Sequence, residues 1–313
     1  MDKLIKALHL PSPIHRFSFE EFPDREILVK RDDLIHPQVS GNKWRKLKYN
    51  IQYAIDNGYE GVLSFGGAFS NHLYALAAAC NLAGLKCNAY VRGDGFDSNN
   101  PTMKFLREQG AELTFLDRNT YRKKTQLDFI ADIHEQWPNY YIVPEGGSND
   151  LAVLGVGEVM EEVYDQTKEQ EELLIFSGVG SGSTITGITK GLRPQDKAIG
   201  ILAVNDSSLP AKIKNRLGEM EQNKLQLDLN SHLGGFGKTT PDLIKFINRF
   251  YTRTGIPLEP LYTAKVVYRL LAKLREDAIM ESKTILVMHT GGLQGNYGFD
   301  YRFPGQLNNG LLI

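Results

Sequence analysis

Residues 173–184 read Leu-Leu-Ile-Phe-Ser-Gly-Val-Gly-Ser-Gly-Ser-Thr and join a short apolar segment to a loop rich in glycine and serine. The apolar part is typical of a buried strand, and a stretch with helical spacing follows the loop. Glycines let backbone N–H groups approach an anion, and the hydroxyls of Ser181, Ser183 and Thr184 add donors beside the positive end of the helix. The stretch therefore predicts a strand, a phosphate-binding loop and a helix, although a purely structural Gly/Ser turn stays open.

The spacing within this loop distinguishes among kinds of phosphate site. A dinucleotide fingerprint needs Gly-x-Gly-x-x-Gly, but Ser183 stands where the third glycine after Gly178 and Gly180 is required. A nucleotide-binding P-loop needs Lys directly after its last glycine, and here Ile188 follows Gly187. A single phosphate monoester, bound by neutral donors without magnesium, fits the loop better than either nucleotide.

Strands and helices are expected to alternate along the rest of the chain. The apolar or β-branched runs that predict strands are 27–30, 61–64, 86–92, 112–116, 140–143, 173–176, 199–204 and 284–288. The stretches with helical spacing are 44–57, 71–83, 102–109, 127–136, 153–165, 243–253 and 263–275. This alternation predicts an α/β fold built from βαβ units, with parallel sheets flanked by helices.

Composition limits the kinds of partner. The 36 Lys and Arg residues nearly balance the 37 Asp and Glu residues, so no overall field favours nucleic acid or anionic lipid, and we expect a small-molecule partner. Cys80 and Cys87 are the two cysteines and lack CxxC spacing, which indicates neither a disulfide framework nor a metal site. Because no run of about 18 apolar residues and no signal-peptide pattern occurs, we expect a cytoplasmic protein without membrane contact.

Lys43 is the first candidate for covalent chemistry. It follows the strand at 27–30 and the turn Ser40-Gly41-Asn42, at the start of the next helix. A helix N-terminus disfavours a protonated ammonium and so helps supply the neutral amine that attacks an aldehyde. The alternative is that Lys43 is a solvated basic residue like its neighbours Arg45, Lys46 and Lys48.

Two more loops follow predicted strands. In the loop at 64–72, Ser70 suits a helix N-cap, whereas capping does not require the neighbouring Asn71 and His72, which we expect to face a ligand. The fourth loop, 289–292, reads His-Thr-Gly-Gly and places a threonine hydroxyl at a strand end. Its histidine is interpreted as a satisfied, partly buried side chain.

Six motifs occur in one order along nearly the whole chain. Together they resemble the family of 1-aminocyclopropane-1-carboxylate (ACC) deaminases and D-cysteine desulfhydrases. They are Ser40-Gly41-Asn42-Lys43-x-Arg45-Lys46-Leu47, Ser70-Asn71-His72, Gly146-Gly147-Ser148-Asn149, Gly180-Ser181-Gly182-x-Thr184, Leu258-x-Pro260-x-Tyr262-Thr263-x-Lys265 and His289-Thr290-Gly291-Gly292.

The resemblance implies a pyridoxal 5'-phosphate (PLP) enzyme of fold type II, similar to the tryptophan synthase β subunit. Two α/β domains would enclose the cofactor in the cleft between them. A small domain of residues 45–152 would be inserted into a large PLP-binding domain formed by residues 1–44 and 153–313. The resemblance also implies a homodimer.

The resemblance assigns residues as follows. Lys43 would hold PLP as a Schiff base and act as the base at the substrate α-carbon. Asn71 would bind the ring hydroxyl, and Ser70, Asn71, His72 and Tyr262 would contact the substrate, with Ser70 and Tyr262 assisting catalysis. The phosphate would be bound by Gly180, Ser181, Gly182, Ser183 and Thr184, and the pyridine nitrogen would lie near Thr263 and Thr290.

Two departures from the family bear on the substrate. Family members that open the cyclopropane ring carry Glu where this chain has Thr263, and Tyr where it has Phe236. A neutral pyridine beside threonine suits β-elimination, so the resemblance favours a D-cysteine desulfhydrase-like lyase that yields pyruvate, sulfide and ammonia. The alternatives are an ACC deaminase giving 2-oxobutanoate and ammonia, a homologue for another small D-amino acid, a PLP-binding protein without turnover, and an NAD-dependent oxidoreductase.

Overall fold

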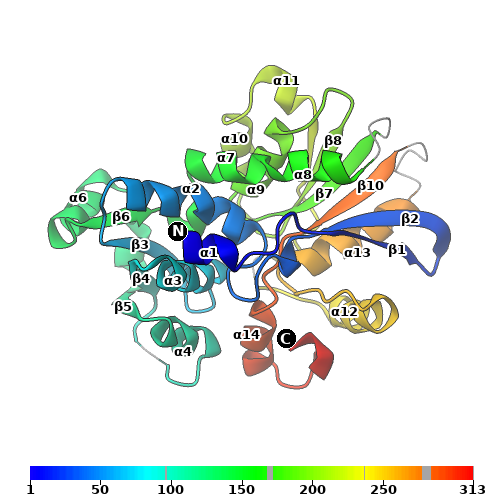
Figure 1. Ribbon diagram of the computed structural model, residues 1–313. Helices are drawn as coiled ribbons and strands as arrows, with labels where there is room; N and C mark the ends of the chain where they lie inside the picture. The colour runs from blue at the N-terminus through cyan, green and yellow to red at the C-terminus, as the bar shows by residue number, and fades with distance from the viewer. Residues whose placement is uncertain (96, 168–171, 236, 277–282, 313) are drawn as a thin grey trace.

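The computed structural model describes residues 1–95, 97–167, 172–235, 237–276 and 283–312. These residues form two sheets that lie side by side with helices around both (Figure 1). The larger sheet has the strand order β1-β2-β10-β7-β8-β9, and the smaller sheet has the order β5-β4-β3-β6. All strands of the smaller sheet lie between residues 61 and 143, and those of the larger sheet lie before and after that segment.

The strands agree with the predicted runs, with two additions. The additions are β1 and β9, and β1 pairs antiparallel with β2 at one edge of the otherwise parallel larger sheet. Only two residues separate β1 from β2, which forces the chain to turn back. The strands are β1 (Ile14–Phe19), β2 (Phe22–Arg31), β3 (Gly61–Gly67), β4 (Lys86–Arg92), β5 (Ala111–Leu116), β6 (Tyr140–Val143), β7 (Leu173–Val179), β8 (Lys197–Leu202), β9 (Leu225–Asp228) and β10 (Thr284–His289).

Most long helices also match the predicted stretches, but the one expected at 153–165 is two helices, α7 and α8. Glycines at 155 and 157 weaken the helix there. The helices are α1 (Asp2–Lys6), α2 (Asn42–Asp56), α3 (Asn71–Ala83), α4 (Pro101–Glu108), α5 (Arg118–Arg122), α6 (Leu127–Gln136), α7 (Asp150–Gly157), α8 (Val159–Gln166), α9 (Ser183–Lys190), α10 (Leu209–Lys214), α11 (Glu219–Gln222), α12 (Pro241–Thr254), α13 (Thr263–Arg275) and α14 (Gly295–Arg302).

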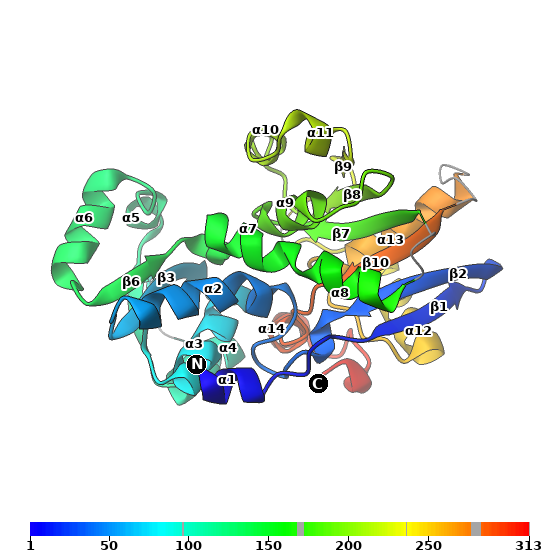
Figure 2. The ribbon, with the colours of Figure 1, turned by 45° about the horizontal axis from the view of Figure 1, so that its top comes forward.

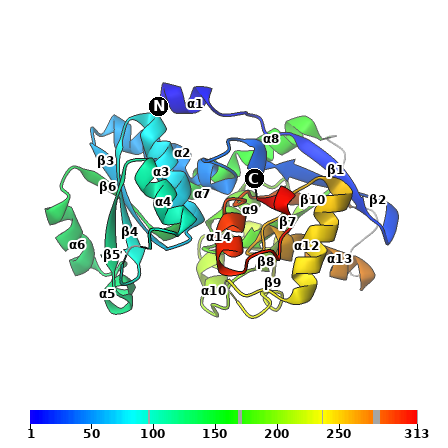
Figure 3. The ribbon, with the colours of Figure 1, turned by 90° about the horizontal axis from the view of Figure 1, so that it is seen from below.

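Both faces of the smaller sheet are covered by helices (Figure 3). Along β3, Val62 packs into the cluster that includes α2, α3 and α4, whereas Leu63 and Phe65 pack on the opposite face with residues of α6. Successive side chains of a strand point to opposite faces, so a fully buried parallel strand is apolar on both. This explains why β3 has apolar residues on both faces, with Ser64 as the polar exception.

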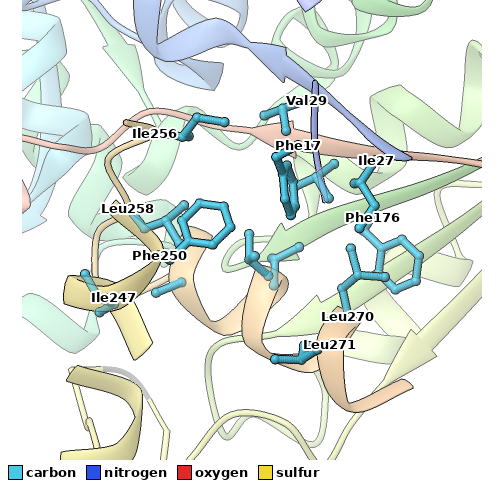
Figure 4. Close-up of a cluster of buried hydrophobic side chains, with 14 of the residues drawn as sticks. Phe17, Ile27, Val29, Phe176, Ile247, Phe250, Ile256, Leu258, Leu270 and Leu271 are labelled. Atoms are coloured by element: carbon cyan, nitrogen blue, oxygen red, sulfur yellow. The ribbon is translucent and has the colours of Figure 1, made fainter. Parts of the chain in front are cut away.

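The larger sheet is also buried on both faces. Ile27, Val29 and Phe176 pack against α12 and α13 (Figure 4), whereas Leu28 and Ile175 pack against α7, α8 and α9. None of the helices in the described part of the chain is long and apolar enough to cross a membrane.

Two helices carry the chain between the sheets. α2 leads into the smaller sheet, α7 leads out of it, and the two pack side by side (Figure 2). A Cβ atom at Gly155 of α7 would lie 2.2 Å from the carbonyl oxygen of Arg45 of α2, so this close contact requires glycine. The expected domain limits, 44/45 and 152/153, fall within these two helices, and the division into domains remains a prediction.

The apolar layer between the larger sheet and α13 predicts the effect of truncating Phe176, which has no exposed surface. We expect Phe176→Ala to lower the free energy of unfolding by about 3–5 kcal/mol, because the lost burial leaves a cavity. Urea unfolding followed by circular dichroism measures this change. The control is Leu127→Ala, whose side chain is 86% exposed and which should change the free energy by no more than about 0.5 kcal/mol. Equal effects of the two substitutions would contradict the described core.

Candidate active site

Five loops that follow strand ends meet between the two sheets. They follow β2, β7 and β10 of the larger sheet and β3 and β6 of the smaller sheet. The carboxyl ends of neighbouring parallel strands share an edge, so the loops after them converge. The sequence predicted site residues on four of these loops, and contacts between the loops show that they surround one region.

The first turn of α2 touches both the loop after β10 and the end of the Gly-rich loop. Gly41 has φ +65°, and a Cβ there would lie 2.0 Å from the carbonyl oxygen of Thr290, so only glycine fits. The amide of Asn42 donates to the same oxygen at 3.2 Å, and Asn42 Nδ2 donates to Thr184 Oγ1 at 2.9 Å. Lys43 is thereby held between the loop after β10 and the Gly-rich loop.

The amine of Lys43 is partly buried and donates a hydrogen bond from Nζ to Asn42 Oδ1 at 2.7 Å. Burial lowers the pKa of Lys43 to about 8, against the opposing effect of the negative charge of Glu259. The position of Lys43 at a helix N-terminus was expected to favour the neutral amine. The structure gives burial as the main cause.

The basic neighbours of Lys43 do not form a solvated face. Arg45 is buried and donates from Nε and Nη2 to the two carboxylate oxygens of Asp32 at 2.7 Å each. It also donates from Nη1 and Nη2 to Glu162 at 2.9 and 3.0 Å. Lys46 is buried as well. The alternative of a solvated basic stretch around Lys43 is therefore wrong for Arg45 and Lys46.

The Gly-rich loop lies between α10 and Tyr262. A Cβ at Gly182, which has φ +92°, would lie 2.7 Å from Ile213 Cγ1, and a Cβ at Gly180 would lie 2.9 Å from Tyr262 Cε1. Among the described residues no side chain caps α9, so the N–H groups of its first turn remain available to an anion. The loop therefore has the backbone donors that the sequence analysis predicted.

Lys46 is a site residue that the sequence analysis did not assign. Its Nζ donates to Gly146 O at 3.1 Å and to Ser181 Oγ at 3.3 Å, and burial together with the charges of Lys43 and Arg216 holds its pKa well below the usual range. The signal was present, because residues three apart on a helix share a face and Lys46 is three residues after Lys43.

Ser70 and Asn71 lie at the start of α3. Ser70 Oγ accepts a hydrogen bond from the Leu73 amide at 3.2 Å, so it caps the helix, and no residue that the structure describes accepts its own proton. Asn71 extends toward the larger sheet, where a Cβ at Gly292 would lie 2.8 Å from its Nδ2. The loops after β3 and β10 therefore meet at Asn71.

His72 is buried with a defined hydrogen-bonding state. The Ser64 hydroxyl donates to Val143 O at 2.7 Å, so it accepts from His72 Nε2 at 2.8 Å, and Nδ1 of His72 is left unprotonated. Nδ1 has no hydrogen-bond partner among the described residues. Burial, with smaller contributions from Lys43 and Lys46, lowers the pKa of His72 to about 3, so the ring is neutral.

Tyr262 and Glu259 lie at the N-terminal end of α13. The fully buried Glu259 carboxylate accepts N–H bonds from Leu261, Tyr262 and Thr263 at 2.7, 2.8 and 2.6 Å. Burial raises the pKa of Glu259, and these bonds oppose the shift. Burial, aided by the charges of Glu259 and Glu145, also raises the pKa of the Tyr262 phenol, which stays protonated at neutral pH.

The two threonines expected near a ring nitrogen belong to adjoining segments. Thr263 Oγ1 accepts from the Glu259 amide at 2.9 Å and contacts the Glu259 carbonyl oxygen at 3.3 Å. Thr290 follows His289, whose Nε2 lies 2.6 Å from Pro257 O. As the sequence analysis proposed for it, His289 is a buried side chain with its own partners.

The neutral, buried state of His72 predicts a dependence of stability on pH. Below pH 6.5 an unfolded chain protonates this histidine and the folded chain does not, so stability falls as the pH drops. Between pH 7.5 and 5.5, His72→Gln should lose about 1.4 kcal/mol less unfolding free energy than the wild type, as measured by urea unfolding. His134→Gln, a change at an exposed position on α6, should behave as the wild type. Equal losses in wild type and His72→Gln would rule out the assigned state.

Comparisons with known proteins agree with this geometry. The model of the family described as pyridoxal-phosphate dependent enzyme matches residues 5–291. The mitochondrial bifunctional D-cysteine desulfhydrase/1-aminocyclopropane-1-carboxylate deaminase of Arabidopsis thaliana is 28% identical over 92% of this chain and 78% of its own length. A putative 1-aminocyclopropane-1-carboxylate deaminase of Thermotoga maritima is 30% identical over 86% of this chain and 89% of its own.

A solved structure supports the fold. The crystal structure of an ACC deaminase homologue superimposes with a TM-score of 0.83 at 24% identity and covers 97% of this chain and 96% of its own. At that identity the likeness concerns the fold alone, which is PLP fold type II. With a family match across most of its length, this chain belongs to the pyridoxal-phosphate dependent enzymes.

Proposed function

We propose that this PLP-dependent lyase acts on D-cysteine and, with one water consumed, releases pyruvate, hydrogen sulfide and ammonia. The names of its relatives support a small amino acid as substrate: one of Klebsiella pneumoniae, 28% identical over 94% of this chain, is a D-cysteine desulfhydrase. The observation that favours sulfide elimination over ring opening is Thr263, which stands where ring-opening family members carry the carboxylate of a Glu.

The residues present fit the cofactor. Lys43 offers a partly buried amine with a lowered pKa, and the uncapped first turn of α9 with Ser181, Ser183 and Thr184 offers donors to a phosphate. Lys46 adds an amine donor beside Ser181. PLP supplies an aldehyde for the lysine amine and a ring that withdraws electrons from the substrate α-carbon.

The side chains divide the remaining work. Lys43, once its amine is free, takes the α-proton, for which a pKa of about 8 leaves a usable neutral fraction. The Ser70 hydroxyl proton, not needed for capping, is available to the substrate carboxylate. The protonated Tyr262 phenol can donate toward the departing sulfur.

Thr263 and Glu259 carry the choice of substrate. A carboxylate beside the pyridine nitrogen would keep the ring protonated, and in its place this chain has Thr263, whose hydroxyl bonds to the Glu259 backbone, together with Thr290. The nearby Glu259 carboxylate is engaged by three backbone N–H groups of the α13 N-terminus. A neutral ring, which supports loss of a good leaving group better than ring opening, is the expected consequence.

ACC deamination is the second candidate, because relatives carry that name. Phe236, which stands where ring-opening family members carry Tyr, lies outside the described part of the chain. The homodimer, the cytoplasmic location and the individual residue roles remain predictions.

Product release tests the substrate. The PLP-loaded protein should form pyruvate and sulfide from D-cysteine and no 2-oxobutanoate from ACC, as measured by 2-oxo acid release from D-cysteine, L-cysteine, D-serine and ACC separately. Formation of 2-oxobutanoate from ACC at a comparable rate would refute the role given to Thr263.

Tyr262→Phe should lower turnover of D-cysteine at least tenfold, because the proton donor is lost.

The lowered pKa of Lys43 gives a prediction for cofactor loading. The rate at which the cofactor-free protein and PLP develop Schiff-base absorbance should rise with pH around a midpoint near 8, rather than near 10.5 as for a solvated lysine. Lys43→Ala should show no such band. Lys48→Ala removes a neighbouring amine that pairs with Glu158 and should retain the wild-type profile. A band in Lys43→Ala would refute the assignment of Lys43.

A further inference from the structure

Arg216 lies beside the Gly-rich loop and has no role in the function described so far. It follows α10, whose Ile213 packs beneath Gly182 with 2.7 Å between Ile213 Cγ1 and a Cβ placed on that glycine. Leu217, the next residue, is buried. Arg216 is thus fixed at the loop by buried residues on both sides of it.

The Arg216 guanidinium reaches two serine hydroxyls. Nη1 donates to Ser148 Oγ at 3.3 Å and to Ser183 Oγ at 3.4 Å, and Nη2 donates to Ser148 O at 3.5 Å. The two hydroxyl oxygens are 2.6 Å apart. Arg216 therefore joins the turn before α7 to the first residue of α9.

These contacts leave one hydroxyl proton available. A guanidinium only donates, so both serine oxygens accept from Arg216. One of the two hydroxyls donates to the other, and its partner keeps a proton with no acceptor in the pair. That proton lies beside the uncapped first turn of α9, where backbone N–H groups also need an acceptor.

The charges around the loop are one-sided. Among the described residues no carboxylate pairs with Lys46 or with Arg216. The lowered pKa of Lys46 reflects burial first and then repulsion from Lys43 and Arg216. An anion placed between Lys46 and Arg216 would relieve this repulsion.

We propose that Arg216 is a ligand of the cofactor phosphate, and that together with Ser148 and Lys46 it makes the pocket selective for a phosphate dianion. This rests on the assignment of the loop at residues 180–184 to the cofactor phosphate. Lys46 places an amine on the α2 side of the loop, which an anion bound there would keep protonated, and Arg216 supplies a positive charge on the α10 side. Ser148 and Ser183 accept hydrogen bonds from the guanidinium, and the pair is left with one oriented hydroxyl proton to donate to the phosphate.

A comparison of two cofactor forms tests the proposal. Dissociation constants of cofactor-free protein for PLP and for pyridoxal, which lacks the phosphate, are measured by Schiff-base absorbance. Arg216→Gln should weaken PLP binding about 10- to 100-fold, the loss expected for a charge-assisted hydrogen bond, and leave pyridoxal binding within about twofold of wild type. Arg216→Lys keeps the charge and should recover part of the loss.

Lys212→Gln is the matched control, because it removes a positive charge from exposed α10 surface close to Arg216 in the chain. Its ratio of pyridoxal to PLP dissociation constants should equal that of the wild type. Equal weakening of both cofactor forms in Arg216→Gln would show a merely structural role, and no change in either would also overturn the proposal. If Arg216→Gln does not fold, Arg216→Lys and Ser148→Ala decide, since unchanged ratios in both would refute it.

Ser181→Ala separates failure of this proposal from failure of the loop assignment. A changed ratio in Ser181→Ala with an unchanged ratio in Arg216→Gln would overturn the role of Arg216 alone. Unchanged ratios in both variants would overturn the assignment of the loop to the phosphate. Phosphorus NMR of bound PLP gives an independent readout, in which the protonation midpoint of the phosphate should be lower in wild type than in Arg216→Gln.

Discussion

The site depends on the ion pairs that the buried guanidinium of Arg45 makes with Asp32 and Glu162. Its hydrogen bonds to Asp32 and Glu162 fix α2 to the end of β2 and to α8. Arg45 lies about one helical turn after Gly41, where only glycine fits beside Thr290 O. A buried ion pair of this kind adds little net stability, but removing one partner leaves an uncompensated charge. It therefore fixes where the first turn of α2, and with it Lys43, can lie.

From that fixed turn, the electrostatics of the site follow in two directions. Toward the Gly-rich loop, Lys43, Lys46 and Arg216 gather positive charge, and burial lowers the pKa of both lysines. Toward α13, the Glu259 carboxylate is held by backbone N–H groups and contributes negative charge to Lys43. The site is thus arranged to receive an anionic group at one end and to set the protonation of a single amine between the two ends.

Sequence patterns gave the fold where the pattern was local. The bounds of α3, α6 and α13 agree with the helical spacing, and the parallel strands other than β9 agree with the apolar runs, because both faces of each sheet are covered. The pattern missed β1, whose outer residues are exposed at a sheet edge, and it merged α7 with α8. In both places a tight turn or a close helix contact, rather than periodicity, decides the backbone.

For the site, the sequence by itself determined the kinds of residue and their order: a Gly/Ser loop after β7, a lysine after Gly41 and Asn42, and a Ser-Asn-His run at the start of α3. Only the tertiary structure decided that Lys46 contacts Ser181, that Arg216 contacts Ser148 and Ser183, and that His72 is neutral with no partner for Nδ1 in the described part of the chain. The physical reason is distance along the chain. Lys46 and Ser181 are 135 residues apart, and spacing rules describe neighbours within one helix or strand, whereas charge and burial depend on which elements fold together.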